Sequence, residues 1–274
     1  MTGQLPLWAR SAFHTLEDLG LQPLKLLALC GLPSYLRDLN HFRRLQRQAT
    51  CELRAAFSLA PMLADRYVGA GAGSGRSLYF LQDLICSTYV LRDPPCQHLD
   101  VGSRVDGFVA QIAASRPIEV LDIRPMVEPP CVNLIFRQGD ILNPHRELCN
   151  NYPLVSSLHA LEHIGLGRYG DAIAPDGFER AVKQCAALVA PHGRFLLSLP
   201  VAQIPRHLVQ FNSQRLFAAR QLTDLLSRML PGFVPVWTTL IDQRRKPITT
   251  EAEPDLLLET FEGFGLVAMA WQRR

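Results

Sequence analysis

From residue 96 onward, short apolar runs alternate with longer amphipathic segments, and this alternation restricts the possible folds more than any other feature of the chain. Two helices are predicted among these runs, over residues 105–115 and 175–193. Strands that alternate with helices predict an α/β domain with a parallel sheet covered on both faces. The predicted strands are 97–103, 118–124, 132–141, 153–159 and 193–201.

The C-terminal part departs from this alternation. A further helix is predicted over residues 213–230, and two strands over 232–241 and 263–272. The segment between these strands is polar and contains proline. It cannot hold a full crossover connection, although it could hold a short helix. We therefore expect the two strands to pair antiparallel at the edge of the sheet.

The N-terminal part reads differently. Residues 1–60 carry leucines at helical spacing and predict helices, and 77–91 predicts another. The glycine-rich segment 67–77 is interpreted as a flexible connector, because a weak strand precedes it and no acidic residue follows at the spacing of a nucleotide loop. We expect two parts: residues 1–76, a helical extension with its connector, and residues 77–274, the α/β domain.

Basic side chains lie between the N-terminal leucines. They could contact an anionic membrane surface or a polyanionic substrate, but a solvated helix face or a subunit contact, such as a homodimer, is the simpler interpretation. The net charge of +3 is too small to indicate nucleic acid. The arginines concerned are Arg37, Arg43, Arg44, Arg47 and Arg54.

Cysteine usage and hydropathy indicate the compartment. The seven cysteines are scattered and odd in number, with no C-x-x-C pair, so neither a disulfide framework nor a zinc knuckle is predicted. No secretory signal is visible, and the longest apolar run near the N-terminus is well short of the ~20 residues that a membrane span needs. We expect a reduced, cytoplasmic protein.

Acidic residues follow the first three predicted strands. In an open α/β sheet, ligands bind beyond the carboxyl ends of the strands, where the strand order reverses. Asp100 and Gly102 follow the first strand, and the glycine permits a tight turn before a helix N-terminus. Asp122 ends the second strand and could bind two ribose hydroxyls, while Asp140 follows the third and could meet an adenine amino group. These strand ends predict a nucleoside-shaped pocket.

The order of LDVGS, VLDIR, QGDIL, LVSSLHALEHIG and GRFLLSLP, followed by an antiparallel pair, resembles the class I S-adenosylmethionine-dependent methyltransferases over residues 96–274. The segments YFLQDL, HLDVGSRVDGFVAQIA, SSLHALEHIGLGRYGD and FNSQRLF resemble a branch of that superfamily associated with bacterial polysaccharide and glycan genes. The resemblance implies a doubly wound, Rossmann-like sheet of seven strands in the order 3-2-1-4-5-7-6. It also implies S-adenosylmethionine as the cofactor.

The resemblance assigns cofactor residues by position. Asp122 falls at the ribose and Asp140 at the adenine. One departure concerns the loop, because Arg104 and Asp106 stand where the family commonly has further glycines. Arg104 could reach the methionine carboxylate, or it could crowd the loop. The remaining cofactor positions are Asp100, Gly102, Ser103 and Ser157.

The motif HALEH, residues 159–163, matches the H-x-x-E-H zinc-protease pattern. That chemistry needs one continuous helix and a further ligand, whereas an apolar strand precedes the motif and glycines follow it. No metal is therefore predicted. As the end of the fourth strand, the motif places His159 near the transferred methyl group, as first candidate for general base. His163 is the second candidate, with Glu162 beside them, although Glu162 and His163 could simply fix the turn.

The predicted function is methyl transfer to a hydroxyl of a glycan or glycan precursor. The loop 165–171 would lie over the cleft and offer Arg168, Tyr169 and Asp171 to a polar, sugar-like acceptor. The N-terminal helices could help shape the site. Two alternatives stay open: a methyltransferase-like protein that only binds a cofactor or a partner, and a zinc hydrolase acting through H-x-x-E-H.

Overall fold

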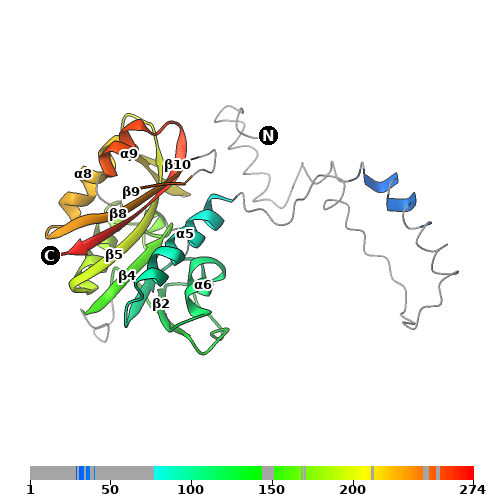
Figure 1. Ribbon diagram of the computed structural model, residues 1–274, viewed down its shortest axis with the longest axis horizontal. Helices are drawn as coiled ribbons and strands as arrows, with labels where there is room; N and C mark the ends of the chain where they lie inside the picture. Colours follow the sequence, from blue (N-terminus) through cyan, green and yellow to red (C-terminus); the bar gives the residue numbers. More distant parts are fainter. Residues whose placement is uncertain are drawn as a thin grey trace. The chain divides into compact units, whose positions relative to one another are not determined.

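The computed structural model divides the chain into two units, Met1–Ser74 and Gly75–Arg274 (Figure 1). Of the five N-terminal arginines considered for a membrane or substrate contact, only Arg37 lies among the described residues. It is exposed and lies in a helical turn. Most of residues 1–60, and the connector up to residue 76, lie outside them. The described residues are 29, 31–33, 35–37, 40, 77–143, 151–167, 169, 171–210, 213–242, 247–250 and 254–274.

The second unit is built on one twisted sheet whose first five strands run parallel. The antiparallel strands β10 and β8 take the seventh and sixth places of the expected order, so the doubly wound topology is confirmed. Strand β9 adds a further antiparallel edge beyond β8. Across the sheet the order is β3 (Leu134–Gln138), β2 (Ile118–Asp122), β1 (His98–Val101), β4 (Tyr152–Leu158), β5 (Val189–Ala202), β10 (Phe264–Arg273), β8 (Phe233–Asp242) and β9 (Pro247–Thr250).

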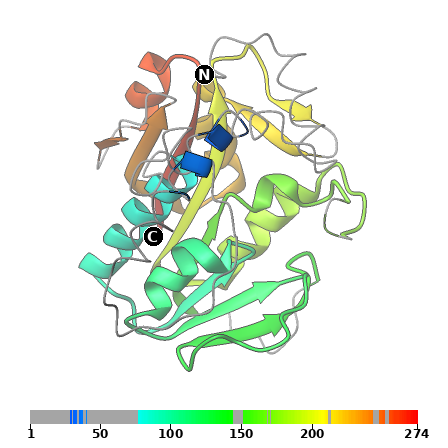
Figure 2. The ribbon, with the colours of Figure 1, turned by 90° about the vertical axis from the view of Figure 1, so that its right-hand side faces the viewer.

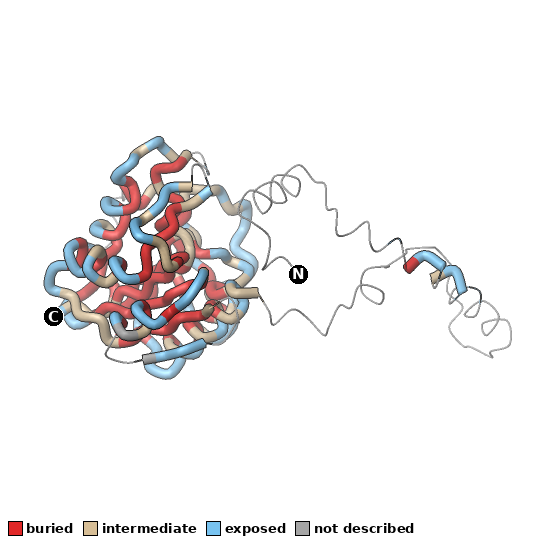
Figure 3. Tube along the Cα trace, turned by 90° about the horizontal axis from the view of Figure 1, so that it is seen from above, coloured by how far each residue is buried: buried red, intermediate tan, exposed pale blue. Residues whose placement is uncertain are grey.

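Helices cover both faces of this sheet (Figure 2). One apolar cluster joins the sheet to α5 (Leu78–Arg92) and α6 (Ala110–Ala113). The other joins it to α7 (Gly177–Leu188), α8 (Ala219–Met229) and α9 (Pro254–Thr260). Side chains alternate between the two clusters along central strands such as β4 and β10, as the strand geometry requires. The central strands β1, β2, β4, β5 and β10 are buried along most of their length (Figure 3), which explains why they appear as nearly continuous apolar runs.

The predicted helix over 213–230 is wrong at its start. Gln214–Ala218 forms strand β7, which pairs with β5 and with the short strand β6 (Leu208–Gln210), and α8 begins only at Ala219. Leu216 and Phe217 are buried in this pairing. Burial between two strands therefore outweighs the helical pattern that continues into α8.

Two other boundaries differ from the predicted ones. The segment after β1 begins as a π-helical turn, Val105–Val109, which is kinked at Gly107 (φ −123°, ψ −113°), and only Ala110–Ala113 is α-helical. Helix α7 ends at Leu188 and strand β5 starts at once, so Pro191–Gly193 belong to the strand. A short helix, α9, does lie between the last two long strands, as the sequence permits. Among the described residues, no helix is long and apolar enough to cross a membrane.

Candidate functional site

The loop after β1 is organised by Asp100, whose side chain is fully buried. One carboxylate oxygen accepts hydrogen bonds from the hydroxyls of Ser103 at 2.8 Å and Ser156 at 2.6 Å, and the other accepts from the Ser103 amide at 3.0 Å. The Ser156 hydroxyl in turn lies 2.8 Å from Nε2 of His98. Burial raises the pKa of Asp100 to about 6. Asp100 thus fixes the loop from inside the sheet.

The other small residues of the predicted cofactor loop also join strands. Gly102 has φ +73°, a conformation that favours glycine. The Ser103 hydroxyl accepts a hydrogen bond from the Leu158 amide at 2.8 Å, and the Ser157 hydroxyl donates to the Val101 carbonyl at 2.7 Å. Both serine side chains are buried, and their hydrogen bonds hold β1 against β4.

Arg104 and Asp106, which replace the family's further glycines, pair with each other. The guanidinium donates to both carboxylate oxygens, at 3.0 and 2.7 Å, and the two side chains are 64% and 71% exposed. They therefore turn toward solvent. Gly107 follows Asp106, and Asp83 of α5 packs closely against it. A Cβ added to Gly107 would lie 2.2 Å from a carboxylate oxygen of Asp83. Helix α5 thus helps to shape the loop.

The second and third strand ends each carry a partnered carboxylate. Asp122 accepts hydrogen bonds from the Arg124 amide at 2.8 Å and from its guanidinium at 2.5 to 3.2 Å. The same guanidinium lies 4.8 Å from the centre of the Tyr169 ring. Asp140 accepts from the Leu142 amide at 2.9 Å and forms the turn after β3. Both predicted nucleoside carboxylates therefore stand at the expected edge.

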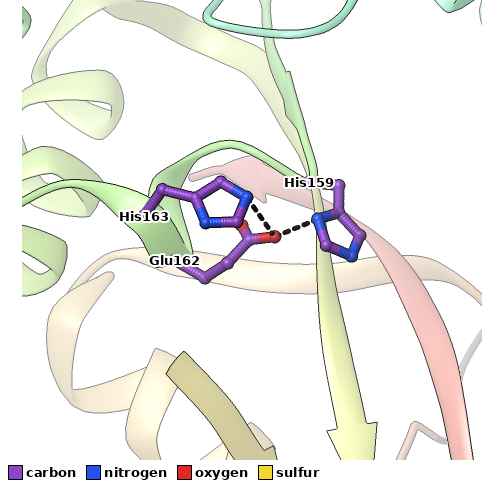
Figure 4. A group of neighbouring side chains, drawn as sticks. All are labelled: His159, Glu162 and His163. Carbon is purple, nitrogen blue, oxygen red and sulfur yellow. Dashed lines mark ion pairs between the residues drawn. The ribbon is translucent and has the colours of Figure 1, made fainter. Parts of the chain in front are cut away.

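The structure brings together the three polar side chains of HALEH, although not on one helix (Figure 4). Strand β4 ends at Leu158, His159 adopts φ +52°, and Leu161–His163 forms a single 3₁₀ turn. The Glu162 carboxylate forms ion pairs with Nδ1 of His159 and, at 3.6 Å, with Nε2 of His163. The helical arrangement of a zinc protease is absent from this turn.

Glu162 is the most buried member of this cluster. Its side chain is 0% exposed, against 6% for His159 and 9% for His163. Burial by itself would raise the pKa of Glu162, but the charge and close contact of His159, together with the charge of His163, hold that pKa below its usual range. The carboxylate is therefore ionised at neutral pH.

The ring nitrogens of the two histidines differ in their partners. Nδ1 of His163 lies 2.7 Å from the carbonyl oxygen of Ser213, so it carries a proton and donates it there. The backbone amide of His159 donates to the Ser198 carbonyl at 3.1 Å. Nε2 of His159 points away from Glu162 (Figure 4). The Tyr79 ring packs edge-on against this imidazole at 4.8 Å.

The loop predicted to meet the acceptor is held by its own carboxylate. Asp171 accepts hydrogen bonds from the amides of Gly165 at 2.6 Å, Gly167 at 3.3 Å and Tyr169 at 3.2 Å. Asp171 therefore fixes the loop from within. Tyr169 is half-exposed, and its ring lies 5.8 Å from that of His163. Arg168 lies outside the described residues.

Several site residues were not anticipated. Arg215 of β7 is buried and donates to the carbonyls of Glu162 at 3.1 Å and Ile164 at 2.6 Å, so it clamps the turn after β4. Gln82 of α5 accepts a hydrogen bond from Ser198 at 2.6 Å. Arg215 lies in the segment FNSQRLF, which resembles the family, but the sequence gives no indication of its contact with the turn after β4. The unanticipated residues are Tyr79, Gln82, His98, Arg124, Ser156 and Arg215.

Comparisons with known proteins address the fold. Residues 134–255 match a family model described as a Caenorhabditis protein of unknown function, DUF268. No curated protein sequence matches this chain. The crystal structure of the [4+2]-cyclase SpnF is 12% identical, with a TM-score of 0.50, and the match covers 70% of this chain and 81% of that one. The chain has a doubly wound, Rossmann-like fold, which it shares with the [4+2]-cyclase SpnF.

Two other solved structures are similar. One is the 1,6-didemethyltoxoflavin-N1-methyltransferase of Burkholderia thailandensis with S-adenosylhomocysteine, at 16% identity, a TM-score of 0.49, and coverage of 80% of this chain and 93% of that one. The other is the glycopeptide N-methyltransferase MtfA, at 13% identity, a TM-score of 0.48, and coverage of 70% and 95%.

Proposed function

We propose that this chain is an S-adenosylmethionine-dependent methyltransferase that acts on a hydroxyl of a glycan or glycan precursor. The observation that carries the proposal is the position of one cluster. His159, Glu162 and His163 follow β4, which lies next to β1, and the strand order reverses between these two strands. In this fold class that crevice is the ligand site, so a base would stand beside the bound cofactor.

The cofactor half of the proposal depends on the ends of β1 to β3. The ribose hydroxyls would donate to Asp122 and replace its contacts with the Arg124 side chain. The hydrogen bond from the Arg124 backbone amide to the same carboxylate can remain. The adenine amino group would donate to Asp140. The loop after Asp100 supports this arrangement, because its hydrogen bonds keep the backbone in place before any ligand binds.

The acceptor half depends on His159. With Nδ1 donating to Glu162, the lone pair of the imidazole lies on Nε2, which points away from the carboxylate (Figure 4). Methyl transfer breaks the bond from sulfur to the methyl carbon and forms a new carbon–oxygen bond, and the hydroxyl proton passes to Nε2 of His159. Glu162 holds the ring in this tautomer and stabilises the imidazolium, as a buried carboxylate does in other histidine bases.

The polar, sugar-like acceptor is supported by the rim of the cluster. The half-exposed ring of Tyr169 lies next to His163 and offers a flat surface and a hydroxyl. A hydroxyl acceptor is also consistent with a buried base, because an alcohol must lose its proton during methyl transfer. A neutral amine can attack the methyl group before it loses a proton.

The test is transfer of a labelled methyl group from S-adenosylmethionine to matched sugars that differ only in a hydroxyl or an amino group. We expect label in an alkali-stable ether on the hydroxyl sugar. We expect this label to be lost in His159→Asn and retained in His192→Asn, a matched control because both histidines have positive φ. Binding of the cofactor without transfer to any acceptor would favour the non-catalytic alternative. Label on the amine alone would contradict the hydroxyl assignment.

A further inference from the structure

We propose that His159, Glu162 and His163 bind one divalent ion of a first-row transition metal. The inference goes beyond the proposed function and does not depend on it, because the three side chains form the site without any contribution from the cofactor loop. It also departs from the sequence, which predicts no metal because the motif does not lie on a helix.

The first argument is the environment of Glu162. Its side chain is 0% exposed, and the carboxylate faces the imidazoles of His159 and His163. Burial of such a charge costs several kcal/mol unless a positive charge faces it (on the order of that size per ion). A metal ion between the carboxylate and the rings would supply that charge with both imidazoles neutral.

The second argument is the tautomer of His163. Because Nδ1 donates its proton to the Ser213 carbonyl, Nε2 of the neutral ring turns a lone pair toward the Glu162 carboxylate, 3.6 Å away. A metal ion between the two groups would make this contact favourable with the ring neutral, whereas without an ion the contact is favourable only when Nε2 is protonated. A ring nitrogen that donates to a backbone carbonyl is also the usual outer contact of a metal-bound histidine.

The third argument is size and donor type. One nitrogen from each histidine and one carboxylate oxygen lie within 4.8 Å of one another. Ligands of an ion with bonds of about 2.1 Å lie at most about 4.2 Å apart, so small side-chain rotations close the site. Two imidazoles and a carboxylate suit manganese, iron, cobalt or zinc better than magnesium or calcium. Three protein ligands also leave a position open for an acceptor oxygen.

The backbone around the cluster is held from neighbouring strands. Arg215 of β7 binds the carbonyl oxygens of Glu162 and Ile164, and the amide of His159 binds Ser198 of β5. The Arg215 guanidinium is therefore engaged with carbonyl oxygens of the turn. The three side chains shown in Figure 4 thus start from a turn that is already fixed.

The ion and a proton would compete for Nδ1 of His159. In the metal-free cluster this ring is the base described above. With an ion bound to Nδ1, Nε2 would carry the ring proton and His159 would no longer act as the base. The ion would instead lower the pKa of an acceptor hydroxyl at the open position, whose proton would pass to water. Metal affinity should therefore fall as the pH is lowered.

The experiment uses the full chain without a histidine tag, stripped with EDTA and dialysed separately against Mn²⁺, Co²⁺ and Zn²⁺. Metal analysis should find about one ion per chain for at least one of them, with an increase in Tm. Glu162→Gln and His159→Asn should each weaken binding at least about tenfold. His192→Asn, which also removes a histidine at positive φ, should bind as the wild type does. Circular dichroism verifies folding.

Fewer than about 0.1 ions per chain with all three metals would overturn the proposal, as would unchanged binding in the two cluster variants. If those variants do not fold, pulsed EPR of the Mn²⁺ or Cu²⁺ form of His192→Asn replaces them. Modulation from imidazole nitrogen supports the site, and its absence overturns it. All measurements are made without S-adenosylmethionine, so failure to bind the cofactor contradicts only the proposed function.

Discussion

Two fully buried carboxylates lie on neighbouring strands, Asp100 within β1 and Glu162 just after β4, and they differ in the groups that face them. Asp100 is surrounded by neutral donors, the hydroxyls of Ser103 and Ser156, and its pKa is raised to about 6 because burial dominates. Glu162 is faced by two imidazoles, which outweigh burial and hold its pKa below the usual range.

The difference separates two uses of the same chemical group. Donors that cannot change charge make Asp100 a fixed part of the loop, and the loop is where the cofactor is expected. Partners that can gain a proton or bind a metal keep Glu162 charged and leave the cluster able to do chemistry. Burial alone therefore does not identify a functional carboxylate, whereas the nature of its partners does.

The largest expected effect is on catalysis. Glu162→Gln should lower kcat for methyl transfer by about 10² to 10⁴, because the His159 tautomer is no longer fixed. Affinity for S-adenosylhomocysteine should stay the same. Steady-state kinetics measures the change, with the exposed Glu179→Gln as matched control. A variant that retains more than about a tenth of the activity would remove the chemical distinction between the two carboxylates.

The next effect concerns the cofactor half. Asp122→Asn should weaken binding of S-adenosylhomocysteine by about tenfold to a hundredfold, since hydrogen bonds to a charged acceptor contribute about 1.5 to 3 kcal/mol. Calorimetric titration measures this change. Asp93→Asn is the control, because Asp93 also pairs with an arginine, Arg194, outside the predicted cleft. Equal affinities in both variants would mean that Asp122 does not contact the ribose.

A smaller effect tests the Asp100 network through His98. Burial and the charge of Arg116 lower the pKa of His98 from 6.5 to about 3. Between these values the unfolded chain binds a proton that the folded chain does not, so the stability due to neutral His98 is complete above pH 6.5 and is lost as the pH falls.

The stability of the wild type relative to His98→Gln should therefore rise by about 1 kcal/mol per pH unit between pH 4 and 6, and level off above pH 7. Urea unfolding at several pH values measures it. Asp100 contributes a slope of opposite sign in both proteins, so the difference isolates the histidine. A difference that does not change with pH would show that His98 is not held neutral in the fold.

The smallest effect is at the surface of the same loop. Arg104→Gln breaks an exposed ion pair with Asp106 and should change the free energy of unfolding by less than about 0.5 kcal/mol. Thermal unfolding at low and high salt measures it. A loss of more than about 1 kcal/mol would indicate that the pair helps to hold the loop, so Asp100 would not be the only anchor.

Much of the fold was predictable because its signal is local. Buried parallel strands appear as apolar runs, and Asp122 at the end of β2 and Asp140 shortly after β3 mark the carboxyl ends of these strands in the sequence. The sequence does not reveal strand β7, because β7 passes directly into α8 and the hydrophobic pattern shows no break at Ala219. Its strand character comes from pairing with β5 and β6, which local pattern does not report.

The candidate site was predictable only in part for the same reason. His159, Glu162 and His163 are neighbours in sequence, so the motif could be recognised. The residues that hold them are remote: Arg215 binds the carbonyl of Glu162 from 53 positions away, and Ser156 binds Asp100 from 56. Contacts of this kind depend on the topology of the sheet, and spacing in one sequence carries no signal for them.

The most direct test of the central claim is calorimetric titration of the full chain with S-adenosylhomocysteine. If the ends of β1 to β3 hold the cofactor beside the His159 cluster, the wild type should bind about one molecule per chain, with affinity in the micromolar range (a Kd of ~1 μM corresponds to about −8 kcal/mol). No detectable binding by the folded protein would contradict the account.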